Sequence, residues 1–403
     1  MQTQLAEFIK ETEDGKLADS ILRSCVHCGF CNASCPTYLL LGDENDSPRG
    51  RIYLIKQLLE GKDIGEKTLQ HLDRCLTCRS CETACPSGVQ YEKLLDIGRR
   101  IAEERITRDA TSAKARKHLL KFLPYGGRFK LALKMGRSFK FLLPKTTSKK
   151  IPEKRKIGEL PNRVHARKML ILDGCVQPAL SPETNAATAR VLDKLGISLI
   201  PTPKAGCCGA VSHHLAAPDQ AKDFMRKNID AWWNAIEDGA EAIVITASGC
   251  GSMVKDYAHH LRNDPDYAEK AAKVSALCKD ISEIIIKERY QIFTRNNREK
   301  ITWHPPCSLQ HGQKITGIVE TILEDIGYEL KPITDSHLCC GSAGTYSMLQ
   351  AEIADQLREQ KLKQIHQQKP EIIVTANIAC QTHLQEKTET TVQHWIHLLD
   401  QVD

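Results

Sequence analysis

The sequence predicts a mixed α+β and α/β fold, in which a mostly helical N-terminal domain precedes two copies of one parallel βαβ domain. Three observations lead to this prediction. Two four-cysteine motifs of equal spacing lie within the first 98 residues. A different set of four cysteines occurs twice after residue 166, which indicates a duplication. Short apolar runs alternate with helical periodicity in this later part, as is typical of parallel βαβ units.

The composition excludes several classes of protein. The chain has 17 cysteines among 403 residues, an odd number that cannot be paired completely in disulfides. The segment Met1–Glu13 is charged and lacks the apolar core of a secretory signal, and no run of about 18 apolar residues occurs. We therefore expect a location on the cytoplasmic side of the membrane, where clustered thiols are metal ligands more often than disulfides.

The two N-terminal motifs have the spacing C-x₂-C-x₂-C-x₃-C-P. Residues 25–36 read CVHCGFCNASCP, and residues 75–86 read CLTCRSCETACP. This spacing is typical of bacterial ferredoxins, in which the fourth cysteine binds the other of two 4Fe–4S clusters. Zinc is the alternative, but zinc sites use paired C-x₂-C motifs and need neither the third and fourth cysteines nor the proline. The predicted ligands are Cys25, Cys28, Cys31 and Cys85 for cluster 1, and Cys35, Cys75, Cys78 and Cys81 for cluster 2.

The segment between the motifs belongs to the same predicted domain, residues 1–98. Helical spacing of apolar residues predicts a helix over Arg51–Glu60 that ends at Gly61. Arg49 and Arg51 either offset the negative charge of a cluster or lie on the surface of this helix. We interpret His27 as a solvated loop histidine in preference to a proton carrier.

Residues 99–166 form a predicted basic connector. From Arg99 to Lys168 there are 22 lysines and arginines against 5 aspartates and glutamates. Within it, Pro124 and the following glycines divide 118–143 into two short amphipathic helices. Such helices either bind an anionic membrane surface or cover another subunit, and no nucleic-acid reader motif is present. Lys145–Pro161 is rich in lysine and proline and is predicted to be a linker.

The C-terminal part contains a repeated four-cysteine set, and it predicts two domains, residues 167–290 and 291–403. The first cysteine precedes a Cys-Cys-Gly sequence by 32 positions in both copies. Predicted strands alternate with predicted helices here; the strands are at 169–172, 198–200, 242–246, 301–303 and 371–375, and the helices at 187–195, 219–236 and 349–365. The cysteines follow strand ends, where parallel sheets gather ligands. Buried core thiols are the alternative to a further cluster, and Cys278 is expected to be an ordinary packed thiol. The two sets are Cys175, Cys207, Cys208 and Cys250, and Cys307, Cys339, Cys340 and Cys380.

Both kinds of motif together resemble the iron–sulfur subunit of glycolate oxidase, also called glycolate dehydrogenase, through stretches such as SPRGRIYLIKQLLEG, WHPPCSLQHGQ and CCGSAGTYS. The resemblance implies that FAD-containing partner subunits oxidise glycolate to glyoxylate. It further implies that this chain passes the electrons through two 4Fe–4S clusters to a membrane acceptor, expected to be quinone, while attached peripherally to the cytoplasmic side of the inner membrane.

More distant similarities leave alternatives open. Iron–sulfur subunits of lactate and anaerobic glycerol-3-phosphate dehydrogenases, and the heterodisulfide reductase B subunit, are also similar. The heterodisulfide reductase unit ends in C-x-x-C, whereas Met253 and His383 occupy those last positions here. Whether the repeats hold a cluster therefore stays open, and His383 is either a ligand or a structural histidine. A thiol–disulfide reductase and a structural or nucleic-acid-binding iron–sulfur protein are the rival functions.

No catalytic residue for oxidising a hydroxy acid is expected in this chain. The sequence has no dinucleotide-binding glycine motif, no phosphate-binding loop motif and no nucleophile-elbow pattern. The site of substrate oxidation is therefore expected in partner subunits.

Overall fold

The computed structural model describes residues 1–142, 153, 155–294 and 299–401. Most of the predicted linker Lys145–Pro161 lies outside these residues. The chain forms two compact units. The first consists of Met1–Lys117 and Asp335–Lys361, and the second of His118–Thr334 and Leu362–Asp403.

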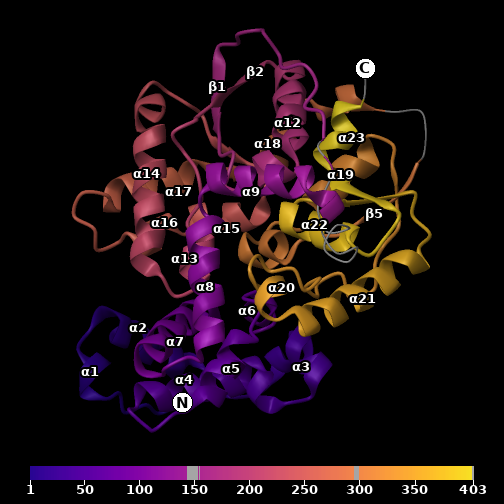
Figure 1. Cartoon of the computed structure of the whole chain (residues 1–403). Coiled ribbons are helices and arrows are strands. Elements are labelled where there is room, and N and C mark those ends of the chain that lie inside the picture. Colours follow the sequence, from indigo (N-terminus) through magenta and orange to yellow (C-terminus); the bar gives the residue numbers. More distant parts are fainter. Residues whose placement is uncertain (143–152, 154, 295–298, 402–403) are drawn as a thin grey trace. The chain divides into compact units, whose positions relative to one another are not determined.

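The first unit is helical in the part that the structure describes, and a single apolar cluster forms its core. Its helices are α1 (Glu7–Lys10), α2 (Glu13–Ser24), η1 (Phe30–Ser34), α3 (Pro36–Leu41), η2 (Glu44–Asp46), α4 (Pro48–Leu59), α5 (Glu66–Asp73), α6 (Ser80–Thr83), α7 (Tyr91–Arg105), most of α8 (Ala110–Phe122), α20 (Tyr346–Leu349) and most of α21 (Ala351–Gln367) (Figure 1).

Helix α4 confirms the helix predicted between the two motifs. It begins earlier than expected because Ser47 caps it, accepting a hydrogen bond from the Gly50 amide at 3.0 Å. Gly61 follows its end with a φ of 77°, a left-handed conformation that favours glycine. Gly98 of α7 lies against Ile55 of α4, where a Cβ atom would come within 2.6 Å of Ile55 Cγ1. Glycine at position 98 therefore permits the close packing of these two helices.

The second unit contains two parallel four-stranded sheets of the same order, which confirms the predicted duplication. The first sheet has the order β2-β1-β3-β4, and the second has the order β6-β5-β7-β8. The strands are β1 (Arg167–Ile171), β2 (Ile197–Pro201), β3 (Ile243–Ile245), β4 (Cys278–Asp280), β5 (Lys300–Trp303), β6 (Glu329–Leu330), β7 (Ile372–Thr375) and β8 (Thr391–His394).

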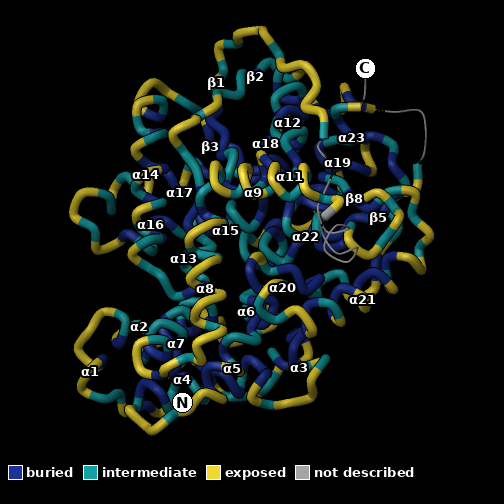
Figure 2. The backbone as a smooth tube through the Cα atoms, in the orientation of Figure 1, coloured by how far each residue is buried: buried dark blue, intermediate teal, exposed yellow. Residues whose placement is uncertain are grey.

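Helices cover both sheets, and buried residues gather at the strands and on the helix faces packed against them (Figure 2). One apolar cluster includes residues of both sheets, so the two repeats share a core. The helices of this unit are α9 (Gly126–Ser138), η3 (Lys140–Leu142), α11 (Gln177–Leu180), α12 (Pro182–Lys194), α13 (Ala210–His214), α14 (Pro218–Glu237), α15 (Ser248–Lys255), α16 (Tyr257–His260), α17 (Ala268–Leu277), α18 (Ile281–Ile285), η4 (Tyr290–Phe293), η5 (Ser308–Gly312), α19 (Ile318–Asp325), α22 (Ile378–Gln385) and α23 (Ile396–Asp400).

Two helices of the basic connector, α8 and α9, are separated near Pro124 as predicted, although α8 begins at Ala110, before the predicted segment 118–143. Neither helix contains a buried residue (Figure 2). Leu131 and Met135, one turn apart on α9, are both exposed. Among the described residues, no helix has the length and apolar character needed to cross a membrane.

Candidate iron–sulfur centres

Five cysteines from both N-terminal motifs line one cavity of about 430 Å³ in the first unit. Four are the predicted ligands of cluster 1, Cys25, Cys28, Cys31 and Cys85, and the fifth is Cys81, which also lines the second cavity. Burial, together with the charges of the neighbouring Cys25, Cys85 and Cys28, raises the pKa of Cys31 to about 11. A metal that accepts thiolates would remove this cost of ionisation. Four convergent thiols match the donor set of a 4Fe–4S cluster.

The other four motif cysteines line a second cavity of about 310 Å³ in the same unit. They are Cys35, Cys75, Cys78 and Cys81, and this set also fits a 4Fe–4S cluster. Two residues of this loop, Thr77 and Arg79, have positive φ angles of 53° and 62°. The loop thereby turns back on itself, and the Thr77 amide donates to Cys75 Sγ at 3.4 Å. Such amide contacts stabilise the thiolate form of a ligand.

Arg51 lies beside this second cavity and is 1% exposed. Burial opposes the charged form of its guanidinium, but the charges of Cys75, Tyr91, Cys35 and Asp46 outweigh that effect and raise its pKa. The interpretation of Arg51 as a surface charge is therefore wrong. Arg49 differs, because it is about one-third exposed and pairs with Glu44 at 2.7 Å.

The four cysteines of the first repeat form one group in the second unit. Cys207 hydrogen-bonds with Cys175 and with Cys208, and Cys208 also hydrogen-bonds with Cys250. The pKa of Cys208 is lowered because Cys207 and Cys250 donate to its sulfur, whereas those two donors have raised pKa values. The sequence brings them together because Cys175 follows β1 and Cys250 lies in the first turn of α15, after β3.

The glycine after each cysteine pair has a steric reason. Gly209 has a φ of 96°, and a Cβ atom there would lie 3.0 Å from the Ala221 carbonyl oxygen. Gly341 has a φ of 90°, and a Cβ atom there would lie 2.6 Å from the Ala354 carbonyl oxygen. Any other residue would strain the backbone and collide with the adjacent helix.

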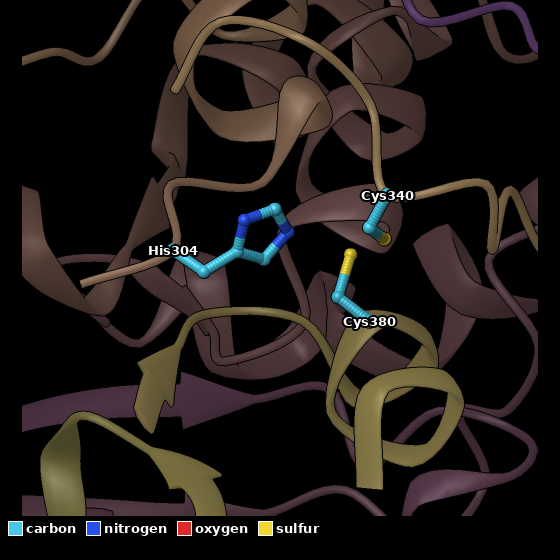
Figure 3. Close-up of side chains that lie close together, drawn as sticks. All are labelled: His304, Cys340 and Cys380. Atoms are coloured by element: carbon cyan, nitrogen blue, oxygen red, sulfur yellow. The ribbon is translucent and has the colours of Figure 1, made fainter. Parts of the chain in front are cut away.

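The second repeat divides between the two units. Cys339 and Cys340 lie on Asp335–Lys361 of the first unit, whereas Cys307, before η5, and Cys380, in α22, belong to the second. Figure 3 labels Cys340 together with His304 and Cys380. Within the second unit, a ring nitrogen of His304 and Sγ of Cys380 lie within 4.8 Å of each other.

His304 was not among the candidates drawn from the sequence. The available signal was its place three residues before Cys307 in WHPPC. The residues that replace the last cysteines of a C-x-x-C pattern are both buried: Met253 packs in an apolar cluster of the first repeat, and His383 lies in α22. Cys278 is fully buried at the start of β4, as expected for a packed thiol.

Comparison with known proteins agrees with this geometry. Residues 21–89 match the 4Fe-4S dicluster domain family, and residues 169–255 and 301–385 each match the family described as Cysteine-rich domain. The glycolate oxidase iron-sulfur subunit of Escherichia coli (strain K12) is 52% identical over 402 residues, which is 100% of this chain and 99% of that protein. The chain belongs to the glycolate oxidase iron–sulfur subunit family.

Other relatives of this family member are more distant. The probable glycolate oxidase iron-sulfur subunit of Bacillus subtilis (strain 168) is 29% identical over 93% of this chain and 89% of its own length. Lactate utilization protein A of Geobacillus thermodenitrificans (strain NG80-2) is 25% identical over 51% of this chain and 85% of its own length. The predicted fold class and the predicted 4Fe–4S cofactors are confirmed, and the chain is an iron–sulfur electron-transfer subunit.

Proposed function

We propose that the chain is the electron-transfer subunit of a glycolate dehydrogenase, in which FAD-containing partner subunits oxidise glycolate to glyoxylate. The observation that carries the proposal is the pair of cysteine-lined cavities within one helical unit. When bound, 4Fe–4S clusters accept and release electrons one at a time. We assign cluster 1 to Cys25, Cys28, Cys31 and Cys85, and cluster 2 to Cys35, Cys75, Cys78 and Cys81.

The partner subunits are proposed to dock over the first cavity. Cys28 is exposed there, and the neighbouring Val26 and Phe30 are 69% and 68% exposed. Adjacent exposed apolar side chains beside a redox site favour a protein partner that covers them. Substrate oxidation then takes place in the partner, and this chain's role is to hold the clusters near that surface.

The membrane attachment is proposed to use α9. Leu131 and Met135 are exposed, and each directly follows a lysine, Lys130 or Lys134, an arrangement that suits the interface of an anionic bilayer. We propose that the chain binds peripherally to the cytoplasmic face, where a quinone acceptor is accessible. Vesicle flotation tests it: the Leu131→Ser/Met135→Ser variant should lose binding to anionic vesicles, and Val164→Ser, which changes an exposed residue before β1, should keep it. Equal binding by both variants would favour subunit docking by α9.

The repeats are proposed to hold a further cluster. The first repeat supplies four thiols joined in a chain of hydrogen bonds, Cys175, Cys207, Cys208 and Cys250, which is a sufficient number for one cluster. The second repeat offers Cys307, Cys339, Cys340 and Cys380. Anaerobic purification with iron and sulfide analysis separates the possibilities, since about eight irons correspond to the ferredoxin-type pair alone and about twelve to sixteen to additional clusters.

The function itself is tested with the Cys78→Ser variant in the complete complex. We expect the partner flavin still to be reduced by glycolate, while electron transfer to the acceptor is lost. Intact acceptor-linked activity would overturn the proposal. Replacing glycolate with lactate or glycerol 3-phosphate in the same assay distinguishes the alternative dehydrogenases.

A further inference from the structure

The guanidinium of Arg51 is held against the second cavity by polar contacts of all three of its nitrogens. Its Nε donates to the His71 carbonyl oxygen at 2.7 Å, and its Nη1 donates to Thr37 Oγ1 at 3.1 Å. The same Nη1 lies 3.9 Å from Cys35 Sγ. Since Arg51 is 1% exposed, a full positive charge lies beside one thiol of this cavity with almost no contact with water.

The negative charge next to Arg51 is shared with a second arginine. Asp46, which is fully buried, accepts from Arg51 Nη2 at 3.2 Å and from Arg74 Nη1 at 2.8 Å. Two guanidiniums therefore contact one carboxylate, and the cluster of charges has a net positive sign. A third arginine, Arg99, donates to the Cys75 carbonyl oxygen at 2.7 Å and adds to this positive potential.

Two buried tyrosines contact residues of this group: Tyr91 lines the second cavity, and Tyr346 contacts Arg74. Tyr91 is buried, and its hydroxyl donates to Cys75 Sγ at 3.6 Å. Tyr346, on the Asp335–Lys361 segment of the same unit, is also buried and donates to the Arg74 carbonyl oxygen at 3.0 Å. In such an environment a charge acts more strongly than in water, because the effective dielectric is low.

The first cavity has a different charge environment. Its arginine, Arg49, lies near Gly29, with Nη1 3.1 Å from the position of a Cβ atom there. Arg49 is balanced one to one by Glu44, and both side chains are more than one-third exposed. Solvent screens such a pair, so it contributes little net potential.

We propose that Arg51 makes the cluster on Cys35, Cys75, Cys78 and Cys81 the more readily reduced of the two, so that electrons pass through this chain from cluster 1 to cluster 2. Reduction adds one negative charge to a cluster, and a buried positive charge stabilises the reduced form. One electron leaves cluster 1 and one is gained by cluster 2, and no proton is transferred. The inference rests on the proposed function, in which a partner flavin supplies its two electrons singly.

The test is an EPR-monitored redox titration of the purified full chain. Cys28→Ser and Cys78→Ser first assign the two signals to cluster 1 and cluster 2. Arg51→Gln is then expected to lower the midpoint potential of cluster 2 by about 59 mV, a tenfold change in the one-electron equilibrium. Arg51→Lys, which keeps the charge, should restore most of the difference.

Two further variants distinguish charge from disruption of the fold. Asp46→Asn removes the negative charge of the shared carboxylate and should raise the midpoint potential of cluster 2. Damage to the packing would not shift this potential in opposite directions in Arg51→Gln and Asp46→Asn. Arg49→Gln should leave cluster 2 unchanged. If the chain holds two clusters but Arg51→Gln and Asp46→Asn leave the potentials unchanged or shift them alike, the inference is overturned and the proposed function stands. A chain with fewer than two clusters would overturn the proposed function instead.

Discussion

Cys85 lies with Cys25 around the first cavity, although the two residues belong to different cysteine motifs. The fourth cysteine of each motif therefore faces the three leading cysteines of the other. This exchange links the two motifs, because neither donor set is complete without a residue from the other motif. Folding around the clusters is consequently expected to be cooperative over the whole helical unit.

Exchange of the fourth cysteines predicts an unusual mutational pattern. Cys85→Ser should remove cluster 1, whose other ligands lie in the first motif, and Cys35→Ser should remove cluster 2. Each variant should lose about four irons and one EPR signal. The assignment is contradicted if Cys85→Ser abolishes the same signal as Cys78→Ser.

The close contact between Gly98 and Ile55 predicts a loss of stability. In Gly98→Ala the new Cβ would lie 2.6 Å from Ile55 Cγ1, and both positions are buried. Such overpacking costs about 1–3 kcal/mol of unfolding free energy. Gly127→Ala is the matched control, since no atom lies within 4 Å of its added Cβ. Anaerobic thermal unfolding should show a lower midpoint for Gly98→Ala, and equal midpoints would refute the packing account.

His394 predicts a pH dependence of stability in the second unit. Burial, followed by the charge of His397, lowers the pKa of His394 to about 3. Its Nδ1 accepts from the Ile396 amide at 3.1 Å, so Nε2 carries the proton and donates to the Thr246 carbonyl oxygen at 2.8 Å. The pKa of histidine in the unfolded chain is about 6.5. The contribution of neutral His394 to the free energy of unfolding is therefore fully present above pH 6.5 and decreases by about 1.4 kcal/mol per pH unit below it.

Tryptophan fluorescence can follow this effect in urea, because all four tryptophans lie in the second unit. The unfolding free energy of the wild type should decrease between pH 6.5 and pH 5 more steeply than that of His394→Gln. Parallel pH profiles for the two proteins would show that another group is responsible.

The exposed surface at the first cavity predicts a defect in partner docking. Val26→Glu/Phe30→Glu introduces charge at the proposed contact, and we expect reduced co-purification with the flavin subunits and at least tenfold slower electron transfer, with the iron content unchanged. Val164→Glu changes an apolar residue elsewhere that is even more exposed, and this variant should behave as the wild type. Normal docking by the double variant would show that the flavin subunits bind another surface of the chain.

Much of the fold was predictable because its signals are local. The central strands β1, β3, β5 and β7 are short apolar runs, and all four were predicted. The strands that were not predicted, β4, β6 and β8, are all at sheet edges. An edge strand pairs on one side only and can be short or polar, as in the two-residue strand β6, so its sequence carries little periodicity.

The surroundings of the candidate site were less predictable. Cysteine spacing alone indicates which thiols converge, because the loop geometry is local. The burial of Arg51 depends on Thr37, Asp46 and the carbonyl of His71, which only the tertiary structure brings together. For the same reason, no sequence pattern indicates that Tyr346 of the second repeat packs in the first unit beside Arg74.

The most direct test of the central claim is freeze-quench EPR on the complex of this chain with its flavin-containing partners. After anaerobic mixing with glycolate, the account predicts reduced 4Fe–4S signals from this chain that appear after flavin reduction and before acceptor reduction. Flavin reduction followed by acceptor reduction, with both clusters remaining oxidised throughout, would contradict it.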